Sequence, residues 1–212
     1  MKTSLKKHLK IYSPKSGFTI IEVSVVFLLI LGVTFWVVPK TLNSTKQAKL
    51  ISKWSQTYSE IEYTFSAIKA QLNGSIFSPK NDLLTVIKPY LRITTKLDTP
   101  YQQYYMNKKE VKSTSIDHFD SFYLTSSNEI IGLKLINQKC DKEQICASVS
   151  YDVNGILLPN TWGYDVFGIN VYKDKIEPMG KNVEQDILKY DCSKIGSGVD
   201  CSYYYLIGGR FD

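Results

Sequence analysis

Histidine is scarce in this chain of 212 residues, which contains only His8 and His118. Histidine is the most frequent general base and a common metal ligand, so its scarcity removes the usual centre of many enzyme sites. The sequence also lacks a G-x-S-x-G elbow, a P-loop, an H-E-x-x-H motif and a dinucleotide fingerprint. The acidic residues are scattered and nominate no acid–base pair. The sequence therefore predicts a protein that is not an enzyme.

The numbers of proline and glycine residues and the net charge are also modest. Seven prolines and twelve glycines argue against a collagen-like or low-complexity chain, and an aromatic content of 13% argues against disorder. The net charge is +6, but residues 1–17 hold five of the lysines and no acid, so the remainder is nearly neutral. A globally basic nucleic-acid-binding protein is not what this distribution describes.

The longest apolar run extends from Phe18 to Val38 and contains one charged residue, Glu22. At about 1.5 Å per residue, a helix of that length crosses a hydrocarbon layer about 30 Å thick. The run is longer than the apolar core of a signal peptide, and no small-residue cleavage site follows it. A membrane anchor explains the run but not Glu22, because a carboxylate within a membrane helix is unfavourable and marks a functional residue.

The residues around Glu22 match a known pattern. The segment Lys15-Ser16-Gly17-Phe18-Thr19-Ile20-Ile21-Glu22-Val23 resembles the processing site of type IV prepilins and type II secretion pseudopilins. The resemblance implies that prepilin peptidase cleaves between Gly17 and Phe18 and then methylates the new N-terminus at Phe18. It also implies that Glu22 acts in assembly by pairing with the α-amine of its own or a neighbouring subunit. The mature chain would be a structural subunit of a pilus or secretion filament.

The same resemblance implies a location and a set of partners. The chain would be a single-pass protein of the cytoplasmic (inner) membrane with an exported head, and then part of a periplasmic or cell-surface filament. Its partners would be prepilin peptidase, membrane lipid, the inner-membrane assembly machinery and other pilin or pseudopilin subunits. The large head favours a minor pilin or pseudopilin, while pilus, secretion and competence systems stay open. A membrane-anchored protein that does not assemble is the alternative.

The hydropathy pattern predicts an α+β fold in which a long N-terminal helix packs on an antiparallel sheet. After the leader, residues 18–39 would form the membrane or filament-core half of the helix, with a kink at Pro39. Residues 40–73 would form an amphipathic half, because apolar residues from Ile51 to Leu72 alternate at spacings of three and four. Residues 74–212 would be the head, with a sheet of about four or five strands. We expect a connector at 81–91, strands at 119–125, 129–136, 145–153, 156–158, 166–172 and 202–207, and a helix at 181–190.

Four cysteines lie in the expected head, at Cys140, Cys146, Cys192 and Cys201. An even number of cysteines in an exported region favours disulfides, and two local loops are the simplest of the three connectivities. A zinc site is the competing interpretation, although the CxxC pairs typical of structural zinc are missing.

Two segments of the head are candidates for ligand binding. Asp152, Asn154 and Asp165 carry oxygen ligands suited to calcium, and some pseudopilins bind calcium in a head loop. The structural interpretation, which we favour, is that Asn154-Gly155 makes a hairpin turn, Asp152 and Asn160 bond nearby amides, and Asp165 caps the next strand. No other cofactor is expected.

The second candidate segment is basic and aromatic. Lys108, Lys109 and Lys112 lie near three tyrosines, at Tyr101, Tyr104 and Tyr105, a combination that can bind single-stranded nucleic acid. This pattern keeps a DNA-uptake module or an adhesin displayed on a filament as an alternative function. A solvated loop beside packed aromatic rings is the preferred interpretation, so nucleic acid is not the expected partner.

Overall fold

The computed structural model describes residues 19–77 and 82–211, which form an α+β fold with four helices and six strands. The α+β class predicted from the sequence is confirmed. The chain divides into two compact units, one up to Ser44 and one from Thr45 onward. Helix α1 (Ile20–Gln71) contributes its first part to the first unit and the remainder to the second, which we call the head.

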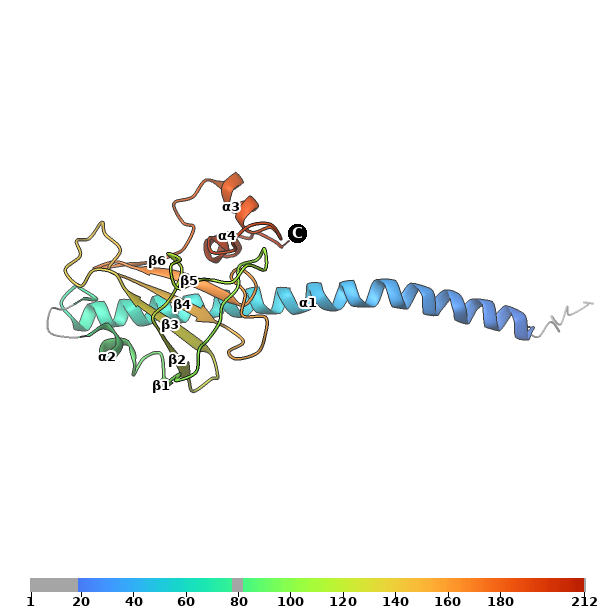
Figure 1. Ribbon diagram of the computed structural model, residues 1–212, viewed down its shortest axis with the longest axis horizontal. Helices are drawn as coiled ribbons and strands as arrows, with labels where there is room; N and C mark the ends of the chain where they lie inside the picture. The colour runs from blue at the N-terminus through green and yellow to red at the C-terminus, as the bar shows by residue number, and fades with distance from the viewer. Residues whose placement is uncertain (1–18, 78–81, 212) are drawn as a thin grey trace, which may run out of the picture. The chain divides into compact units, whose positions relative to one another are not determined.

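The head is built on an antiparallel sheet whose strands are neighbours in the order in which the chain makes them (Figure 1). The strands are β1 (Ile93–Lys96), β2 (Ser121–Thr125), β3 (Ile130–Leu135), β4 (Ala147–Asp152), β5 (Val166–Val171) and β6 (Ile176–Pro178). In the central pair, Ala147 of β4 lies opposite Val171 and Asp152 lies opposite Val166 of β5. Each strand therefore returns beside its predecessor, whether the connection is short, as at 126–129, or long, as at 97–120.

The predicted apolar stripe of α1 lies against one face of this sheet. Trp54, Ile61, Phe65 and Ile68 are buried in one cluster with alternate residues of the strands, among them Val149, Tyr151, Phe167 and Ile169. The ring of Trp54 stacks on that of Phe167 with centroids 4.8 Å apart, and its indole N–H donates to the carbonyl of Ser202 at 2.9 Å. The spacing of three and four residues thus did mark the face of the helix that packs in the core.

A smaller cluster covers the opposite face of the sheet. It contains Val111, Phe119, Trp162, Val166 and Met179, which come from loops and from β5. Neighbouring side chains of β5 lie in different clusters, Val166 in this one and Phe167 in the first, as the two-residue period of a strand demands.

The helix predictions for the head hold in part. The connector expected at 81–91 contains α2 (Leu83–Ile87), and the helix expected at 181–190 begins later, as α3 (Gln185–Asp191). Helix α1 ends at Gln71, and Asn73 and Gly74 follow with φ of 57° and 90°, the left-handed conformation typical of a helix end.

Two predicted strands were wrong. Residues 202–206 belong to α4 (Cys201–Leu206), which the Cys192–Cys201 disulfide and the bond from the Gly168 amide to Ser202 Oγ hold against β5. Residues 156–158 lie in a loop, since β4 pairs with β5 and not with the residues that follow Gly155. The sheet also contains β1 and β6, short edge strands that hydropathy did not predict.

Candidate functional site

The start of α1 carries a reciprocal hydrogen-bonding arrangement between Thr19 and Glu22. The backbone N–H and hydroxyl of Thr19 donate to Glu22 Oε2 at 2.8 and 2.9 Å, and the N–H of Glu22 donates to Thr19 Oγ1 at 3.3 Å. This is a capping box, which satisfies backbone donors at a helix start. The carboxylate that the sequence nominates for assembly is therefore bonded to its own helix when the chain is alone.

The following turns of α1 expose apolar side chains on every side. Examples are Ile20, Leu28, Val33 and Phe35, and the exposed fraction reaches 84% at Ile20 and 83% at Phe35. Residues 20–35 are all exposed, so no face of this stretch is covered. Within residues 19–77 and 82–211, no helix combines the length and the apolarity needed to cross a membrane.

Several residues singled out in the sequence lie outside what the structure describes. Gly17 and Phe18, where cleavage and methylation are expected, precede the first described residue. The side chains of Trp36, Val38 and Pro39 also lie outside the description, so the kink expected at Pro39 stays a prediction.

The loop between β4 and β5 brings Asp152 and Asp165 together. Asp152 Oδ1 accepts the backbone N–H groups of Asn154 and Gly155, both at 2.9 Å, and Asp152 Oδ2 accepts the hydroxyl of Tyr101. Asp165 accepts the backbone N–H groups of Asn160, at 3.0 Å, and of Thr161. The two carboxylates therefore fasten both ends of the loop.

Burial sets the protonation behaviour of this pair. Asp152 is 1% exposed and Asp165 is fully buried. Burial raises the pKa of Asp152 to about 8, and the charge of Asp165 adds to the rise. Burial likewise raises the pKa of Asp165 to about 6, against hydrogen bonds that favour its charged form. The raised pKa values favour the form of the pair in which one carboxyl group keeps its proton.

The same geometry bears on the calcium hypothesis. Asn154 Oδ1 and Asn160 Oδ1 are buried without a hydrogen-bond partner, which leaves oxygens free near the loop. The carboxylate oxygens of Asp152 and Asp165, however, all accept hydrogen bonds from the chain. Among the described residues, no group of three or more acidic, histidine or cysteine side chains is placed to hold a metal. The arrangement fits the structural interpretation for Asp152, but Asp165 and not Asn160 accepts the other backbone amides, and Asn154-Gly155 does not make the expected hairpin.

The basic and aromatic segment is divided between the interior and the surface. The hydroxyl of Tyr101 donates to buried Asp152, and that of Tyr105 donates to Asp117 Oδ2 at 3.0 Å. Lys108 and Lys109 are exposed. Two of the three tyrosines are thus anchored to acidic side chains of the head, an arrangement that fits packing better than a free stacking platform.

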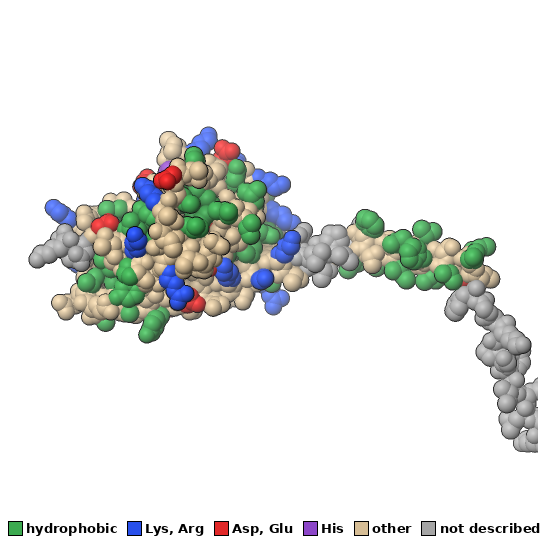
Figure 2. All heavy atoms as spheres, turned by 90° about the horizontal axis from the view of Figure 1, so that it is seen from below, with side chains coloured by type: hydrophobic (Ala, Val, Ile, Leu, Met, Phe, Trp, Pro, Cys, Tyr) green, Lys and Arg blue, Asp and Glu red, His purple; other side chains and the backbone are tan. Residues whose placement is uncertain are grey.

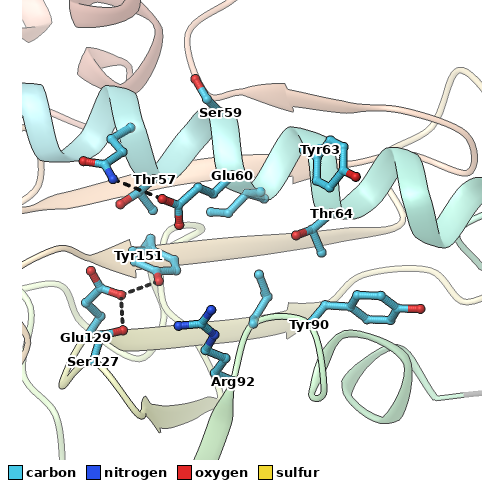
Figure 3. Close-up of a pocket in the computed structure, with 13 residues that line it drawn as sticks. Thr57, Ser59, Glu60, Tyr63, Thr64, Tyr90, Arg92, Ser127, Glu129 and Tyr151 are labelled. Atoms are coloured by element: carbon cyan, nitrogen blue, oxygen red, sulfur yellow. Dashed lines mark hydrogen bonds between the residues drawn. The ribbon is translucent and has the colours of Figure 1, made fainter.

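A groove that sequence reasoning missed lies between α1 and the β1 side of the sheet (Figure 3). Its volume is about 720 Å³. Figure 3 shows Glu60 of α1 facing Arg92, Glu129 and Tyr151 across this space. Glu129 is buried, accepts the hydroxyls of Tyr151 and Ser127 at 2.7 and 3.0 Å, and pairs with Lys53 at 2.9 Å. Glu129 is thus fully engaged with neighbouring side chains, and its pairing with Lys53 ties the helix to the sheet at the groove.

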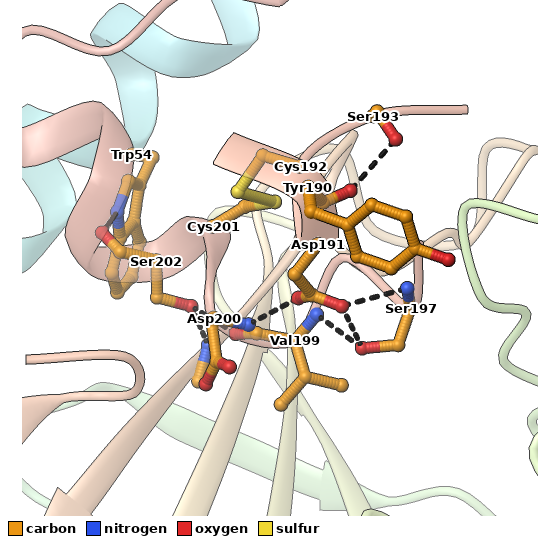
Figure 4. Close-up of a disulfide and its surroundings, with 11 residues drawn as sticks. Trp54, Tyr190, Asp191, Cys192, Ser193, Ser197, Val199, Asp200, Cys201 and Ser202 are labelled. Atoms are coloured by element: carbon orange, nitrogen blue, oxygen red, sulfur yellow. Dashed lines mark hydrogen bonds between the residues drawn. A yellow bond between two sulfur atoms is a disulfide. The ribbon is translucent and has the colours of Figure 1, made fainter. Parts of the chain in front are cut away.

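Both expected disulfides are present, joining Cys140 to Cys146 and Cys192 to Cys201. The second links the end of α3 to the start of α4 (Figure 4). Beside it, Asp191 accepts the backbone N–H and the hydroxyl of Ser197 at 2.8 and 2.6 Å and the N–H of Asp200 at 3.0 Å. The disulfide and Asp191 together close the loop between the two helices.

Comparison of the chain with protein-family models, with curated proteins and with solved structures gave no match.

Proposed function

We propose that the protein is a structural subunit of a type IV pilin-like filament, a minor pilin or pseudopilin held in the inner membrane before assembly. The observation that carries the proposal is the exposed apolar surface of α1 over residues 20–35, in the first unit of the chain. The same chain carries a compact head whose core is formed without these residues.

A helix that is apolar all round needs apolar surroundings on every side. An ordinary docking surface covers one face of a helix and would leave the others in water. Lipid surrounds a single helix completely, and a bundle of identical helices does the same in a filament core. The exposed side chains of Ile20, Leu28 and Phe35 therefore favour membrane insertion followed by bundling.

The start of the helix supports the same function. The segment from Gly17 to Glu22 resembles a prepilin processing site, and Glu22 is the one charged residue in the apolar run. In our proposal Glu22 exchanges its bonds to Thr19 for the α-amine of a neighbouring subunit during assembly. A subunit out of register would leave both charges unpaired in an apolar environment, which makes this pair a register device.

The head fits an exported location. Two disulfides within its 168 residues are typical of proteins that fold outside the cytoplasm. The basic residues 1–17 favour retention of the leader in the cytoplasm, so the apolar segment would orient the head outward.

The proposal is tested by the N-terminus of the mature chain. In cells that contain prepilin peptidase, intact-mass analysis should show a chain beginning at Phe18 and heavier by one methyl group. Gly17→Val should block cleavage, because a branched side chain hinders the close approach of a protease to the backbone. The matched control Ser16→Ala should be cleaved normally. A wild-type chain that retains Met1 in the membrane fraction would contradict the proposal and favour a plain anchor.

A further inference from the structure

The loop between β4 and β5 exposes three consecutive large aliphatic side chains. Ile156, Leu157 and Leu158 have exposed fractions of 71, 66 and 77%. Single exposed aliphatic residues are ordinary at a protein surface, but a contiguous group is typical of a surface that contacts a partner.

This loop is held in place by buried groups. Asp152 accepts the backbone N–H groups of Asn154 and Gly155 before the aliphatic residues, and Asp165 accepts that of Asn160 after them. Gly155, with φ of 72°, lies so close to the carbonyl of Asn128 that any side chain would collide with it. A fixed loop loses little conformational entropy when its tip is buried, which favours binding.

The loop projects from the end of the head at which α1 enters. At this end of the sheet, the ammonium of Lys53 donates to the carbonyl of Val153, and Trp54 stacks on Phe167. At the opposite end, the N–H of Ile76 bonds the carbonyl of Lys173, beyond the last turn of α1. Because Lys53 contacts the start of this loop at Val153, the loop lies at the end of the head where the head's part of α1 begins (Figure 1).

Basic residues surround the same end of the head. Lys46 and Lys49 precede Lys53 by seven and four residues, so the three share one helix face, the face that meets the loop. Both side chains are exposed. Arg210 is also exposed, and the ring of the next residue, Phe211, lies 6.5 Å from that of Tyr164 in the loop.

The exposed charged side chains identified at this end of the head, Lys46, Lys49 and Arg210, are all basic. The acidic side chains beneath the loop, Asp152 and Asp165, are buried. Figure 2 shows basic side chains gathered beside hydrophobic ones at the end of the head where α1 enters. We call the exposed group formed by Lys46, Lys49, Ile156, Leu157, Leu158 and Arg210 the basal surface.

We propose that the basal surface docks on an anionic lipid bilayer, with Ile156, Leu157 and Leu158 inserted among the upper acyl chains and the basic residues on the phosphate headgroups. Apolar tips ringed by lysine and arginine are suited to the interface of an anionic membrane. The inference rests on the proposed function, in which residues 20–35 occupy the membrane before assembly. It adds that the head itself contacts the lipid surface and leaves it when the subunit joins a filament.

A second copy of the chain is the competing occupant. Two basal surfaces brought face to face would place like charges together, which disfavours a symmetric contact. A bilayer with acidic headgroups instead satisfies the basic ring and the aliphatic tip at once. Charge complementarity therefore selects lipid.

The test uses the full chain reconstituted in vesicles of phosphatidylcholine and phosphatidylglycerol, with and without brominated acyl chains. Leu157→Trp places a fluorophore at the tip, and its emission is obtained by subtracting that of the wild type, which contains three native tryptophans. The matched control is Ile116→Trp, an 85% exposed site whose carbonyl bonds Lys134, toward the other end of β3 from the loop.

We expect brominated lipid to quench at least half of the added emission in Leu157→Trp and little of it in Ile116→Trp. Adding Lys46→Glu and Lys49→Glu should reduce the quenching several-fold, as should vesicles of phosphatidylcholine alone. Emission from Leu157→Trp that brominated lipid leaves unchanged, in chains that float with the vesicles, would overturn the inference while leaving the proposed function standing. A chain that fails to float would overturn both. A blue shift that depends on protein concentration and not on lipid would overturn it in favour of a second copy.

Discussion

The ammonium of Lys53, on the helix, lies 2.9 Å from the carboxylate of Glu129, which precedes β3. The Glu129 side chain is only 10% exposed, whereas that of Lys53 is 43% exposed. Glu129 also accepts the hydroxyls of Tyr151 and Ser127, and Lys53 donates to the carbonyl of Val153. A single lysine therefore connects α1 to two separate segments of the sheet.

Replacing this lysine should destabilise the head. Lys53→Met keeps the aliphatic stem but leaves the buried Glu129 without its counter-charge, a loss of about 1–2 kcal/mol after allowance for the partly exposed lysine. Urea denaturation of the single variant and of Lys53→Met with Glu129→Gln provides the measurement. The double variant should be more stable than the single one, because it removes the uncompensated charge. Equal stability of Lys53→Met and the wild type would show that the pair contributes nothing.

The part of α1 in the head could be predicted from the sequence because a local pattern specifies it. The stripe from Ile51 to Leu72 has the period of a helix, and one face of that helix is buried over its whole length in the head. The predictions failed where distant contacts decide the structure. Residues 202–207 have the aromatic content of a strand, yet 202–206 are helical, and the disulfide at Cys201 and the hydroxyl of Ser202 attach this helix to distant parts of the head.

The loop and the groove illustrate the same limit at the candidate sites. Asn154-Gly155 followed by aliphatic residues has the pattern of a hairpin, but Asp165, eleven residues away from Asn154, closes a loop instead. The sequence pattern grouped Asp152 with Asp165 as neighbouring oxygen ligands, but it did not predict the groove. Its walls come from α1, Arg92 and Glu129, segments that no local pattern connects.

The buried acids predict a dependence of stability on pH. The pKa of Asp152 rises to about 8 in the folded head from 3.8 in an unfolded chain, so the folded state binds more protons between these values. The contribution of Asp152 to the free energy of unfolding should therefore be full below about pH 4 and be lost as the pH rises toward 8, with a slope of at most about 1.4 kcal/mol per pH unit.

Asp152→Asn isolates that contribution, because the amide oxygen can still accept the N–H groups of Asn154 and Gly155. Its unfolding free energy should decline less with pH than that of the wild type. The control is Asp120→Asn, at an exposed position, which should follow the wild-type profile. Parallel profiles for all three proteins would contradict the protonated state of Asp152.

Loss of the disulfides should weaken the head by an amount set by loop closure. For loops of this size, the entropy that each disulfide removes from the unfolded chain corresponds to about 2–3 kcal/mol. Replacing Cys192 and Cys201 by alanine should therefore lower the free energy of unfolding by that amount, and so should the same change at Cys140 and Cys146. A reducing agent should destabilise the wild type but leave a variant without the four cysteines unchanged.

Calcium should leave the stability of the head unchanged, because the carboxylates of Asp152 and Asp165 already accept hydrogen bonds from the chain. The measurement is the melting midpoint in saturating calcium and in chelator. A midpoint that rises with calcium concentration would contradict the structural interpretation, since binding to the folded state alone has that signature. Asp165→Asn should then abolish the rise.

The assembly role of Glu22 can be separated from its capping role by three substitutions. Glu22→Gln keeps a side chain that can complete the capping box with Thr19 but removes the negative charge, whereas Glu22→Ala removes both. Thr19→Ala keeps the charge and removes the cap, at a loss of about 1 kcal/mol of helix stability.

If Glu22 pairs with a neighbouring α-amine, Thr19→Ala should assemble almost as well as the wild type, and both Glu22 variants should fail. The readout is the amount of subunit in sheared filaments divided by the amount in the membrane fraction. The amount in the membrane fraction should itself be the same in every variant. The comparison is decisive because the opposite ranking of the variants is expected if Glu22 acts only by capping the helix. A capping role requires Glu22→Gln to assemble normally and Thr19→Ala to be impaired, and that result would remove the charge of Glu22 from the assembly mechanism.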